Sequence, residues 1–339
     1  MKNQRTQDKK LSELKGAKIL VTGAGGFIGS HLVEFLASLG AKVTAFFRYT
    51  SGASLGNLTD SPALKKIKVA FGDMRDSESL GRAVANQNYI FHLAAQIAIP
   101  YSYLSPQDFM EVNALGTTNL LMAAKSSKKL ERILVASTSE VYGSAKITPM
   151  DEDHPQNPQS PYAASKLAAE KISLAMARSY EIPVTVVRPF NCYGPRQSAR
   201  AIIPTIILQG LQRGKFELGS TFPKRDFSFV EDTIRGMALA AISPKTSGRT
   251  LNLCAGEEVS IAWLVKIVCK QLEIRPDIKT DHRRVRPKNS EVSRLMGDNT
   301  LATKLCGYET RVSLEDGIEQ TIRYFRERVD DFRKEDYQL

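Results

Sequence analysis

The first half of the sequence alternates short β-rich runs with longer segments of helical periodicity. Runs rich in β-branched and aromatic residues predict strands at 17–22, 41–47, 67–71, 88–93, 131–136 and 183–188. Between them, helical spacing of apolar residues is found at 27–39, 76–86, 107–126 and 161–180. Strands that alternate with helices form βαβ units with right-handed crossovers. The pattern therefore predicts an α/β fold built on a doubly wound parallel sheet.

The chain changes character after residue 188. Proline and glycine punctuate the segment "RPFNCYGPRQSARAIIP" (188–204), and the regular alternation gives way to mixed elements. We expect residues 17–188 to form the first domain, with a return to its sheet at about 229–255. Residues 189–228 and 256–330 are expected to form a smaller mixed α/β lobe, and residues 1–16 a polar N-terminal extension.

The composition is that of a globular protein: 339 residues, 42% hydrophobic and 24% charged. No apolar run reaches the ~20 residues that a membrane-spanning helix needs, and the N-terminus lacks the apolar centre of a signal peptide. The four cysteines, at positions 192, 254, 269 and 306, form no CxxC pair, so we expect reduced thiols. These features predict a cytoplasmic protein without membrane insertion.

The net charge of +11 raises the question of nucleic-acid binding. Much of the excess lies in the N-terminal extension and in "RRVRPK" (283–288), and no basic stripe is interleaved with aromatic residues. A smaller ligand that carries phosphate accounts for the charge equally well. We therefore expect no nucleic-acid partner. The four histidines lack the spacing of metal ligands, so no metal site is expected either.

A glycine-rich loop, "VTGAGGFIGSHL" (21–32), follows the first predicted strand and opens a helix. Gly23, Gly26 and Gly29 would let backbone amides approach phosphate oxygens, and the positive end of the helix dipole favours the same charge. After the first strand of a βαβ series, this loop predicts a dinucleotide and a Rossmann-type domain. The residues expected to line the cofactor are Gly23, Gly26, Phe27, Ile28, Gly29, Arg48, Asp73, Met74, Leu93, Ala94, Ala95, Tyr162 and Lys166.

The end of the second strand bears on which cofactor binds. An acidic residue there usually holds a ribose 2′-hydroxyl, but this strand ends "AFFRYTSGAS", with Arg48 in place of a carboxylate. An arginine can pair with a 2′-phosphate, which favours NADP over NAD. Asp73, after the third strand, is placed to accept from the adenine amino group. A solvated arginine and a plain turn aspartate remain the alternatives.

A tyrosine and a lysine stand four residues apart in "SPYAASKLAAEKI" (160–172), so Tyr162 and Lys166 share one face of a predicted helix. Tyrosine, with an ordinary pKa near ~10, is a poor base, but a nearby ammonium and an oxidised nicotinamide favour the phenolate. Glu140 follows a strand end rich in Ser and Thr, "ASTSEVYG" (136–143). Taken alone, it is either a turn residue or an acid/base group beside the cofactor.

These motifs together resemble the extended short-chain dehydrogenases/reductases over residues 17–325. The resemblance rests on Gly23–Gly29, "FHLAA" (91–95), the Ser/Thr-rich strand end, Tyr162-x-x-x-Lys166 and "RPFNCYGPR" (188–196). The stretches "RYTSGASLGNL", "IAIPYSY", "STSEVYG" and "GPRQSARAIIPTII" are similar to nucleotide-sugar 4,6-dehydratases, most of all to the group acting on nucleotide-linked N-acetylglucosamine. The smaller lobe would then bind the nucleotide sugar.

The resemblance implies a role for each residue at the strand end. Tyr162 would take the proton of the sugar 4-hydroxyl while hydride leaves C4, with Thr138 bonded to the same oxygen. Lys166 would hold the cofactor ribose and lower the pKa of Tyr162. Glu140 would then remove the C5 proton, water would leave from C6, and the hydride would return to C6.

Ser139 departs from the glucose-type pattern, which has an aspartate there as the acid for the leaving hydroxyl. GDP-mannose dehydratases are similar to this chain at that position. The acid therefore stays unassigned, and Glu140 is a candidate to carry the C5 proton to the departing oxygen.

The resemblance also leaves the reaction and the nucleotide open. UDP-glucuronate decarboxylases share Thr-Ser-Glu, whereas a 4-epimerase needs only Tyr162 and Lys166. A catalytically silent dinucleotide-binding protein would be expected to have lost one of these groups. The sequence does not choose among UDP, GDP and dTDP.

The resemblance finally implies substrate contacts and an assembly. The residues implied to bind the substrate are Asn191, Arg196, Arg200, Arg225 and Arg286, with surface or packing roles as the alternative for Arg196 and Arg200. Helices at 107–126 and 161–180 carry more apolar surface than one sheet face can cover. Equivalent helices pair between subunits in the resembling family, so we expect a homodimer.

Overall fold

A computed structural model describes residues 7, 9–284 and 292–332 of the chain. Its centre is a seven-stranded sheet with the order β11-β6-β5-β4-β1-β2-β3, in which every neighbouring pair is parallel. The strands are β1 (Lys18–Thr22), β2 (Lys42–Arg48), β3 (Lys68–Gly72), β4 (Tyr89–His92), β5 (Arg132–Ala136), β6 (Val184–Pro189) and β11 (Thr250–Leu253). The predicted doubly wound parallel sheet is confirmed.

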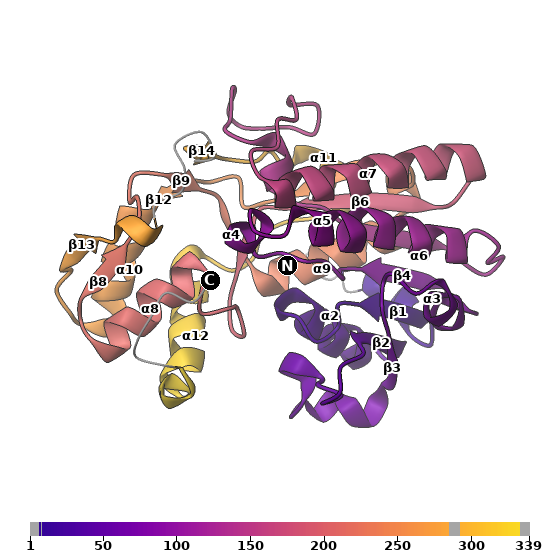
Figure 1. Ribbon diagram of the computed structural model, residues 1–339, viewed down its shortest axis with the longest axis horizontal. Helices are drawn as coiled ribbons and strands as arrows, with labels where there is room; N and C mark the ends of the chain where they lie inside the picture. The colour runs from indigo at the N-terminus through magenta and orange to yellow at the C-terminus, as the bar shows by residue number, and fades with distance from the viewer. Residues whose placement is uncertain (1–6, 8, 285–291, 333–339) are drawn as a thin grey trace.

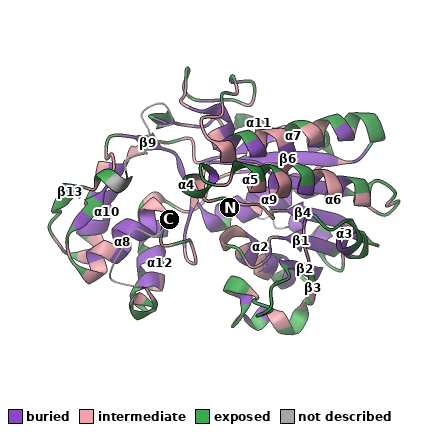
Figure 2. Ribbon diagram, viewed as in Figure 1, coloured by how far each residue is buried: buried purple, intermediate pink, exposed green. Residues whose placement is uncertain are grey.

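Helices cover both faces of this sheet (Figure 1). The helices of this part are α2 (Phe27–Ser38), α3 (Ser77–Val84), α6 (Gly116–Ala124), α7 (Pro161–Tyr180), α9 (Val230–Ile242) and α11 (Thr300–Cys306). Successive strand residues point to opposite faces, so Val21 lies in one buried cluster with α2 and α9, and Leu20 in another with α3, α6 and α7. The central strands β4, β5 and β6 are accordingly buried from end to end (Figure 2).

The predicted helix over 107–126 is divided into three parts. Residues Pro106–Phe109 form α5, residues Met110–Leu115 form a π-helical turn, η4, and α6 follows. Apolar periodicity does not reveal a π turn, because one added residue only shifts the phase of the pattern. A short helix α4 (Ile99–Ser102) precedes this region.

The smaller lobe is made of short strands and helices. Its sheets pair β7 (Asn191–Tyr193) with β10 (Phe227–Phe229), β9 (Lys224–Arg225) with β12 (Val259–Ser260) and β14 (Arg294–Leu295), and β8 (Phe216–Leu218) with β13 (Ile278–Thr280). Its helices are α8 (Ile202–Gln212), α10 (Ile261–Leu272) and α12 (Leu314–Arg326).

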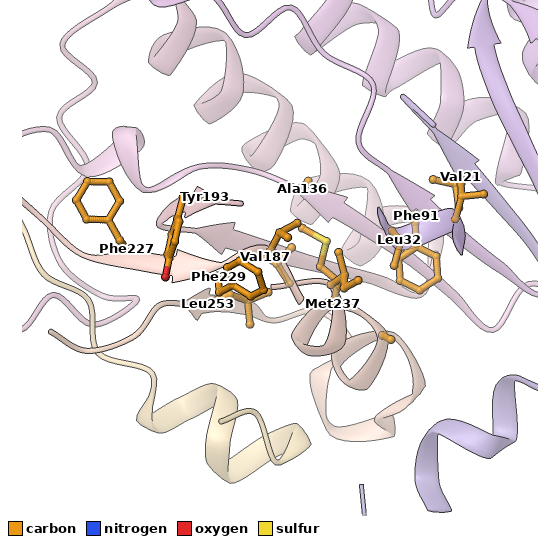
Figure 3. Close-up of a cluster of buried hydrophobic side chains, with 14 of the residues drawn as sticks. Val21, Leu32, Phe91, Ala136, Val187, Tyr193, Phe227, Phe229, Met237 and Leu253 are labelled. Atoms are coloured by element: carbon orange, nitrogen blue, oxygen red, sulfur yellow. The ribbon is translucent and has the colours of Figure 1, made fainter. Parts of the chain in front are cut away.

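One buried apolar cluster runs from the sheet into this lobe (Figure 3). It joins Val21 and Phe91 in the sheet to Met237 on α9, and continues to Tyr193 and Phe229 in the β7–β10 pair. The division of the chain into domains at the predicted boundaries stays a prediction.

The N-terminal extension is less polar in its contacts than in its composition. Leu11 and Leu14 are 2% and 0% exposed and belong to the large cluster beneath α2 and α9. Gln7 donates to the carbonyl of Gly307 (2.5 Å) and accepts from Arg311. Two leucines three residues apart were the sequence signal for this packing.

Within the described residues, no helix is both long and apolar enough to span a membrane. The four cysteines are unpaired. No group of three or more His, Cys, Asp or Glu side chains in this part of the chain is arranged to hold a metal ion.

Candidate active site

The glycine loop lies where a dinucleotide phosphate would need it. β1 lies between β4 and β2, the point at which the strand order reverses, and ligands of such sheets bind at the carboxyl ends of the strands there. Gly23 has a φ of +70°, and a Cβ on it would meet the backbone nitrogen of Ala94 at 2.8 Å. A Cβ on Gly29 would collide with the carbonyl of Gly23. Only glycine fits either position, and α2 starts directly afterwards at Phe27 with Gly26 as its N-cap. The loop therefore fits a bound pyrophosphate.

The end of β4 is fixed to this loop through a buried histidine. His92 Nδ1 lies 2.8 Å from Thr22 Oγ1, and His92 Nε2 lies 2.9 Å from Thr117 Oγ1. Thr22 Oγ1 also accepts from the amide of Ala94 (3.2 Å). Burial lowers the pKa of His92 to about 3, which favours the neutral ring. The ring holds Leu93–Ala95 against the glycine loop.

Asn113 connects the same edge of the sheet to α7, and sequence reasoning missed it. From the π turn η4, its Oδ1 accepts from the amide of Gln96 (2.8 Å). Its Nδ2 donates to the carbonyl of Gln96 (3.0 Å) and to Ser165 Oγ (2.9 Å). An asparagine inside an apolar helix pattern was the available signal, because a buried amide requires partners.

The ends of β2 and β3 bring the predicted adenosine-binding residues together. Arg48 Nε lies 3.8 Å from Asp73 Oδ2, and the Arg48 side chain is 63% exposed. Asp73 also accepts from Arg75, at 2.9 Å from Nε and 2.7 Å from Nη2, and this hydrogen bonding lowers its pKa. Met74 is buried beside them, and its carbonyl accepts from Asn119. Arg75 was not predicted, and it bonds the carboxylate that the sequence analysis expected to accept from adenine.

The tyrosine–lysine pair lies at the start of α7. Ser160 caps this helix by accepting from the amide of Ala163 (3.1 Å), so Tyr162 stands in the first turn and Lys166 one turn later. Burial raises the pKa of Tyr162 to about 12, a hydrogen bond with Thr138 lowers it, and the charge of Glu140 raises it. Burial lowers the pKa of Lys166 to about 8, against the effect of Glu170. Lys166 therefore does not by itself make the phenolate, and the positive charge of an oxidised nicotinamide would have to act as well.

Glu140 comes to this pair on a short 3-10 turn, η5 (Ser139–Tyr142), which follows β5. Thr138 caps the turn, its Oγ1 accepting from the amide of Glu140 (3.3 Å). Ser139 is buried in the same turn. Thr138 and Glu140 both act on Tyr162, as the causes of its pKa shift show. The structure thus brings together the three side chains to which the sequence analysis gave the proton chemistry.

The predicted substrate residues fall into two groups. Asn191 Nδ2 donates to the carbonyl of Asp226 (3.1 Å), and Arg225 is buried on β9 beside it. Arg196 instead pairs with Glu34 on α2 (2.9 Å), which ties the segment after β7 to the helix of the glycine loop. Arg200 is exposed. Arg286 lies outside the described residues.

Asp226 anchors the first group and was not predicted. It is 0% exposed, and its carboxylate accepts from the amides of Ala255 (2.8 Å), Gly256 (2.9 Å) and Gly297 (3.2 Å). Burial raises the pKa of Asp226 to about 7 against these hydrogen bonds. It joins β9 and β10 to the segment after β11, and thereby fixes Arg225 in place.

A chain with this sheet, a glycine loop at its reversal point and a Tyr–Lys pair beside them is a short-chain dehydrogenase/reductase of the extended type. Residues 20–321 match the family profile described as GDP-mannose 4,6 dehydratase. The chain belongs to this family of nucleotide-sugar dehydratases and epimerases.

Its relatives catalyse different reactions. The chain is 33% identical to a UDP-glucose 4-epimerase of Mycolicibacterium smegmatis and 33% identical to a dTDP-glucose 4,6-dehydratase of an Actinoplanes species; each alignment covers 91% of this chain and 98% of the relative. It is 32% identical to a UDP-N-acetyl-alpha-D-glucosaminuronate decarboxylase of Bacillus cytotoxicus, with the same coverage. Sequence identity to these relatives therefore does not show which of the three reactions this chain catalyses.

Solved structures agree with the fold. An epimerase of Methanothermobacter thermautotrophicus superimposes with a TM-score of 0.85 at 28% identity, covering 96% of both chains. A dTDP-glucose 4,6-dehydratase of Streptomyces venezuelae, solved with NAD bound, gives a TM-score of 0.81 at 29% identity, covering 91% of this chain and 97% of the other.

Proposed function

We propose that this chain is an NAD(P)-dependent nucleotide-sugar 4,6-dehydratase acting on a UDP- or GDP-linked hexose of the N-acetylglucosamine type. The observation that carries the proposal is the position of Glu140, on η5 with Thr138, beside Tyr162. Oxidation at C4 uses Tyr162, Thr138 and Lys166. A further base, such as the Glu140 carboxylate, is needed only when another bond, at C5, is broken.

In the proposed mechanism a nicotinamide dinucleotide, held by the glycine loop and Lys166, would supply the acceptor and donor of the hydride that moves from the sugar C4 to C6. Tyr162 takes the proton of the 4-hydroxyl, and Thr138 hydrogen-bonds the same oxygen. Once the 4-keto group acidifies C5, Glu140 removes the C5 proton. The C6 hydroxyl leaves as water, and Tyr162 and Lys166 hold the keto sugar in place until hydride returns.

The acid for the leaving hydroxyl is proposed to be Glu140 itself. Ser139, which occupies the position of the aspartate in glucose-type dehydratases, carries a hydroxyl that is too weak an acid to protonate the leaving group. C5 and C6 are bonded to each other, so one carboxylate between them can take a proton from one atom and deliver it to the oxygen on the next. Atoms and electrons balance: the C5 proton and the C6 hydroxyl leave as water, and the hydride from C4 returns to C6. The proton that Tyr162 took from the 4-hydroxyl passes to solvent, from which C5 is protonated again.

Decarboxylation of a nucleotide-linked uronic acid is the second candidate. It is favoured by the same Thr-Ser-Glu turn and by the 32% identity to a decarboxylase. A catalytically silent binding protein is disfavoured, because Tyr162, Lys166 and Glu140 are all present and gathered in one place.

For substrate binding we propose Asn191, Arg225 and Arg286 as the residues that hold the diphosphate and ribose. The fixed fork of a guanidinium suits phosphate oxygens, and Arg225 is buried, with Nη1 donating to the carbonyl of Lys224 (3.0 Å). The ion pair of Arg196 with Glu34 supports a role in joining the two lobes.

The proposal is tested by incubating the purified chain with a panel of UDP-, GDP- and dTDP-sugars and weighing the products by mass spectrometry. Dehydration removes one water, decarboxylation removes carbon dioxide, and epimerisation leaves the mass unchanged. A product lighter by one water supports the proposal, and a product that lacks carbon dioxide would replace it with the second candidate.

NADP is proposed as the preferred cofactor. Arg48 ends β2 without a neighbouring carboxylate on that strand, and its exposed guanidinium lies beside Asp73 at the adenosine end of the site. Replacing Arg48 with alanine should weaken NADP binding about tenfold, the value of one charge-assisted contact, and NAD binding much less. Titration calorimetry with both dinucleotides measures this. Equal losses for NADP and NAD would show that Arg48 does not read the 2′-phosphate.

A homodimer through α6 and α7 is also proposed. These helices lie side by side at one flank of the molecule (Figure 1), and the exposed apolar side chains in this region include Leu115 (52%) and Met122 (50%). Joint replacement of both by glutamate should shift light-scattering mass from dimer to monomer, because two charges would have to be buried in the interface. Ile278→Glu, at an exposed apolar residue of the other lobe, is the matched control. A monomeric wild type at micromolar concentration would contradict the proposal.

A further inference from the structure

A buried charge pair joins α7 to β6, and the proposed mechanism does not use it. The side chains of Arg188 on β6 and Glu170 on α7 are 2% and 0% exposed. Arg188 donates from Nε to Glu170 Oε2 (3.0 Å) and from Nη2 to Glu170 Oε1 (2.5 Å). A paired fork of this kind fixes direction as well as distance. It therefore sets how the helix that carries Tyr162 and Lys166 lies on the sheet (Figure 1).

The same guanidinium also reaches the turn that carries Glu140. Arg188 Nη1 donates to the hydroxyl of Tyr142 (2.5 Å), and the guanidinium lies over the Tyr142 ring, 4.7 Å from its centroid. The Tyr142 hydroxyl in turn donates to Asn252 Oδ1 on β11 (2.8 Å). Tyr142 stands two residues after Glu140 in η5. One buried cation thus connects the base-bearing turn to the helix of the Tyr–Lys pair.

The pair also acts on the charge of Lys166. Glu170 follows Lys166 by one helical turn, and its negative charge raises the pKa of Lys166 against the dominant effect of burial, which lowers it to about 8. Tyr162 and Glu170 lie on the same helix as Lys166, and the charge of Lys166 acts on His92 of β4. Arg188 on β6 pairs with Glu170, and Glu140 on η5 acts on Tyr162. His92 is neutral, so Glu170 is the principal counter-charge of the lysine and Arg188 balances it.

We propose that Glu170 and Arg188 are positioning residues that hold η5 and α7 in register and that Glu170, one helical turn from Lys166, is the counter-charge of that lysine. The inference rests on the proposed role of Lys166 at the cofactor, but not on dehydration, since C4 oxidation alone requires the Tyr–Lys pair. A merely structural pair would affect folding without moving the titration of Lys166.

The test is the pH dependence of NAD binding to the full-length chain, measured by calorimetry. The Lys166 ammonium is lost as pH rises through its pKa, so NAD affinity should fall along an alkaline limb centred near pH 8. Lys166→Met should abolish this limb. Glu170→Gln removes the negative charge and leaves the Arg188 cation, so the limb should move by about one pH unit toward acid. Arg188→Met leaves the Glu170 charge unbalanced, so the alkaline limb should move toward higher pH.

The double variant Glu170→Gln/Arg188→Met removes both charges and should bring the limb back close to its wild-type position. Glu170→Asp keeps the charge and should also keep the limb, and it carries the test if the unpaired single variants do not fold. Lys171→Gln, the next residue of α7 and exposed, is the matched control with no shift expected. A folded Glu170→Gln with an unmoved limb would overturn the inference. A limb that survives Lys166→Met would overturn both the inference and the proposed role of Lys166.

Tyr142→Phe tests whether Arg188 positions η5, because this change removes only the hydroxyl that links η5 to Arg188. On any nucleotide sugar that the wild type converts, kcat should fall about tenfold with KM and the NAD-binding limb unchanged, since a small displacement of the base affects the chemical step alone. An unchanged kcat would show that the Arg188 contact does not position η5. Failure of the wild type to convert any nucleotide sugar would count against the proposed function, while the binding titrations would still decide the role of the pair.

Discussion

Replacing Glu140 with glutamine is expected to stop the reaction after C4 oxidation. Glutamine keeps the size and hydrogen bonding of the side chain but cannot remove the C5 proton. Oxidation relies on Tyr162, Thr138 and Lys166, so it should survive, while elimination should fall by ~10²–10⁴, the usual effect of losing a general base. The variant should accumulate a 4-keto sugar together with reduced cofactor, which absorbs at about 340 nm. It should also lose exchange of the C5 hydrogen with deuterated solvent.

Glu78→Gln provides the control for this experiment. Glu78 lies on α3 with a side chain that is 88% exposed, and it has no role in the proposed mechanism, so its replacement removes a solvent-exposed carboxylate and should leave turnover unchanged. If Glu140→Gln turned over at the wild-type rate, the carboxylate would be an ordinary turn residue. A 4-epimerase, which needs no second base, would then be the better interpretation.

Replacing Tyr162 with phenylalanine should instead prevent the first hydride transfer. Without the phenolic oxygen no group takes the 4-hydroxyl proton, and the rate of C4 oxidation should fall by at least ~10²–10⁴. Rapid mixing with substrate should show no reduced cofactor, in contrast to Glu140→Gln. The pair of variants thus separates oxidation from elimination.

The phenylalanine variant is expected to fold normally. The Tyr162 ring packs edge-on against buried Phe109, with 6.3 Å between ring centroids, and phenylalanine preserves this contact. Thermal unfolding and NAD binding are the measurements that check it. Formation of reduced cofactor by folded Tyr162→Phe would show that another group accepts the proton.

The main sheet could be predicted from the sequence because its signals are local. A buried parallel strand such as β5 is a continuous apolar run, and the glycine loop must stand between a strand and a helix. The π turn η4 could not be predicted, since a single inserted residue hardly changes the apolar pattern of a helix. The burial of Leu11 and Leu14 was not predicted, because the other residues of their segment are mostly polar.

The site could be predicted as far as its chemistry is carried by single residues in short motifs. Helical spacing places Tyr162 and Lys166 on one face, whereas only the family resemblance singled out Glu140 from an ordinary turn residue. The supporting pairs could not be predicted, because their members are distant in sequence and opposite in charge on separate elements. Arg188 and Glu170 stand 18 residues apart, and Arg196 and Glu34 stand 162 apart. Such pairs become visible only once the elements are placed in space.

The same limit applies to the adenosine end of the site. The sequence indicated that Arg48 and Asp73 end neighbouring strands, but not that Arg75 bonds Asp73 through two nitrogens. The basic residue after the aspartate was visible as part of "FGDMRD" (71–76), although a turn arginine usually points to solvent. Cofactor choice therefore depends on how these three charges rearrange around a dinucleotide.

The central claim, that Glu140 serves elimination at C5 and C6, is tested most directly by running the wild-type reaction in deuterated water. Apart from the one deuterium that it gains, the product should be lighter than the substrate by one water. NMR should place that deuterium at C5, because the proton removed by Glu140 leaves with the C6 oxygen and C5 is protonated again from solvent. A product of unchanged mass without deuterium at C5 would contradict the account, since it would show that the sugar was only oxidised and reduced at C4.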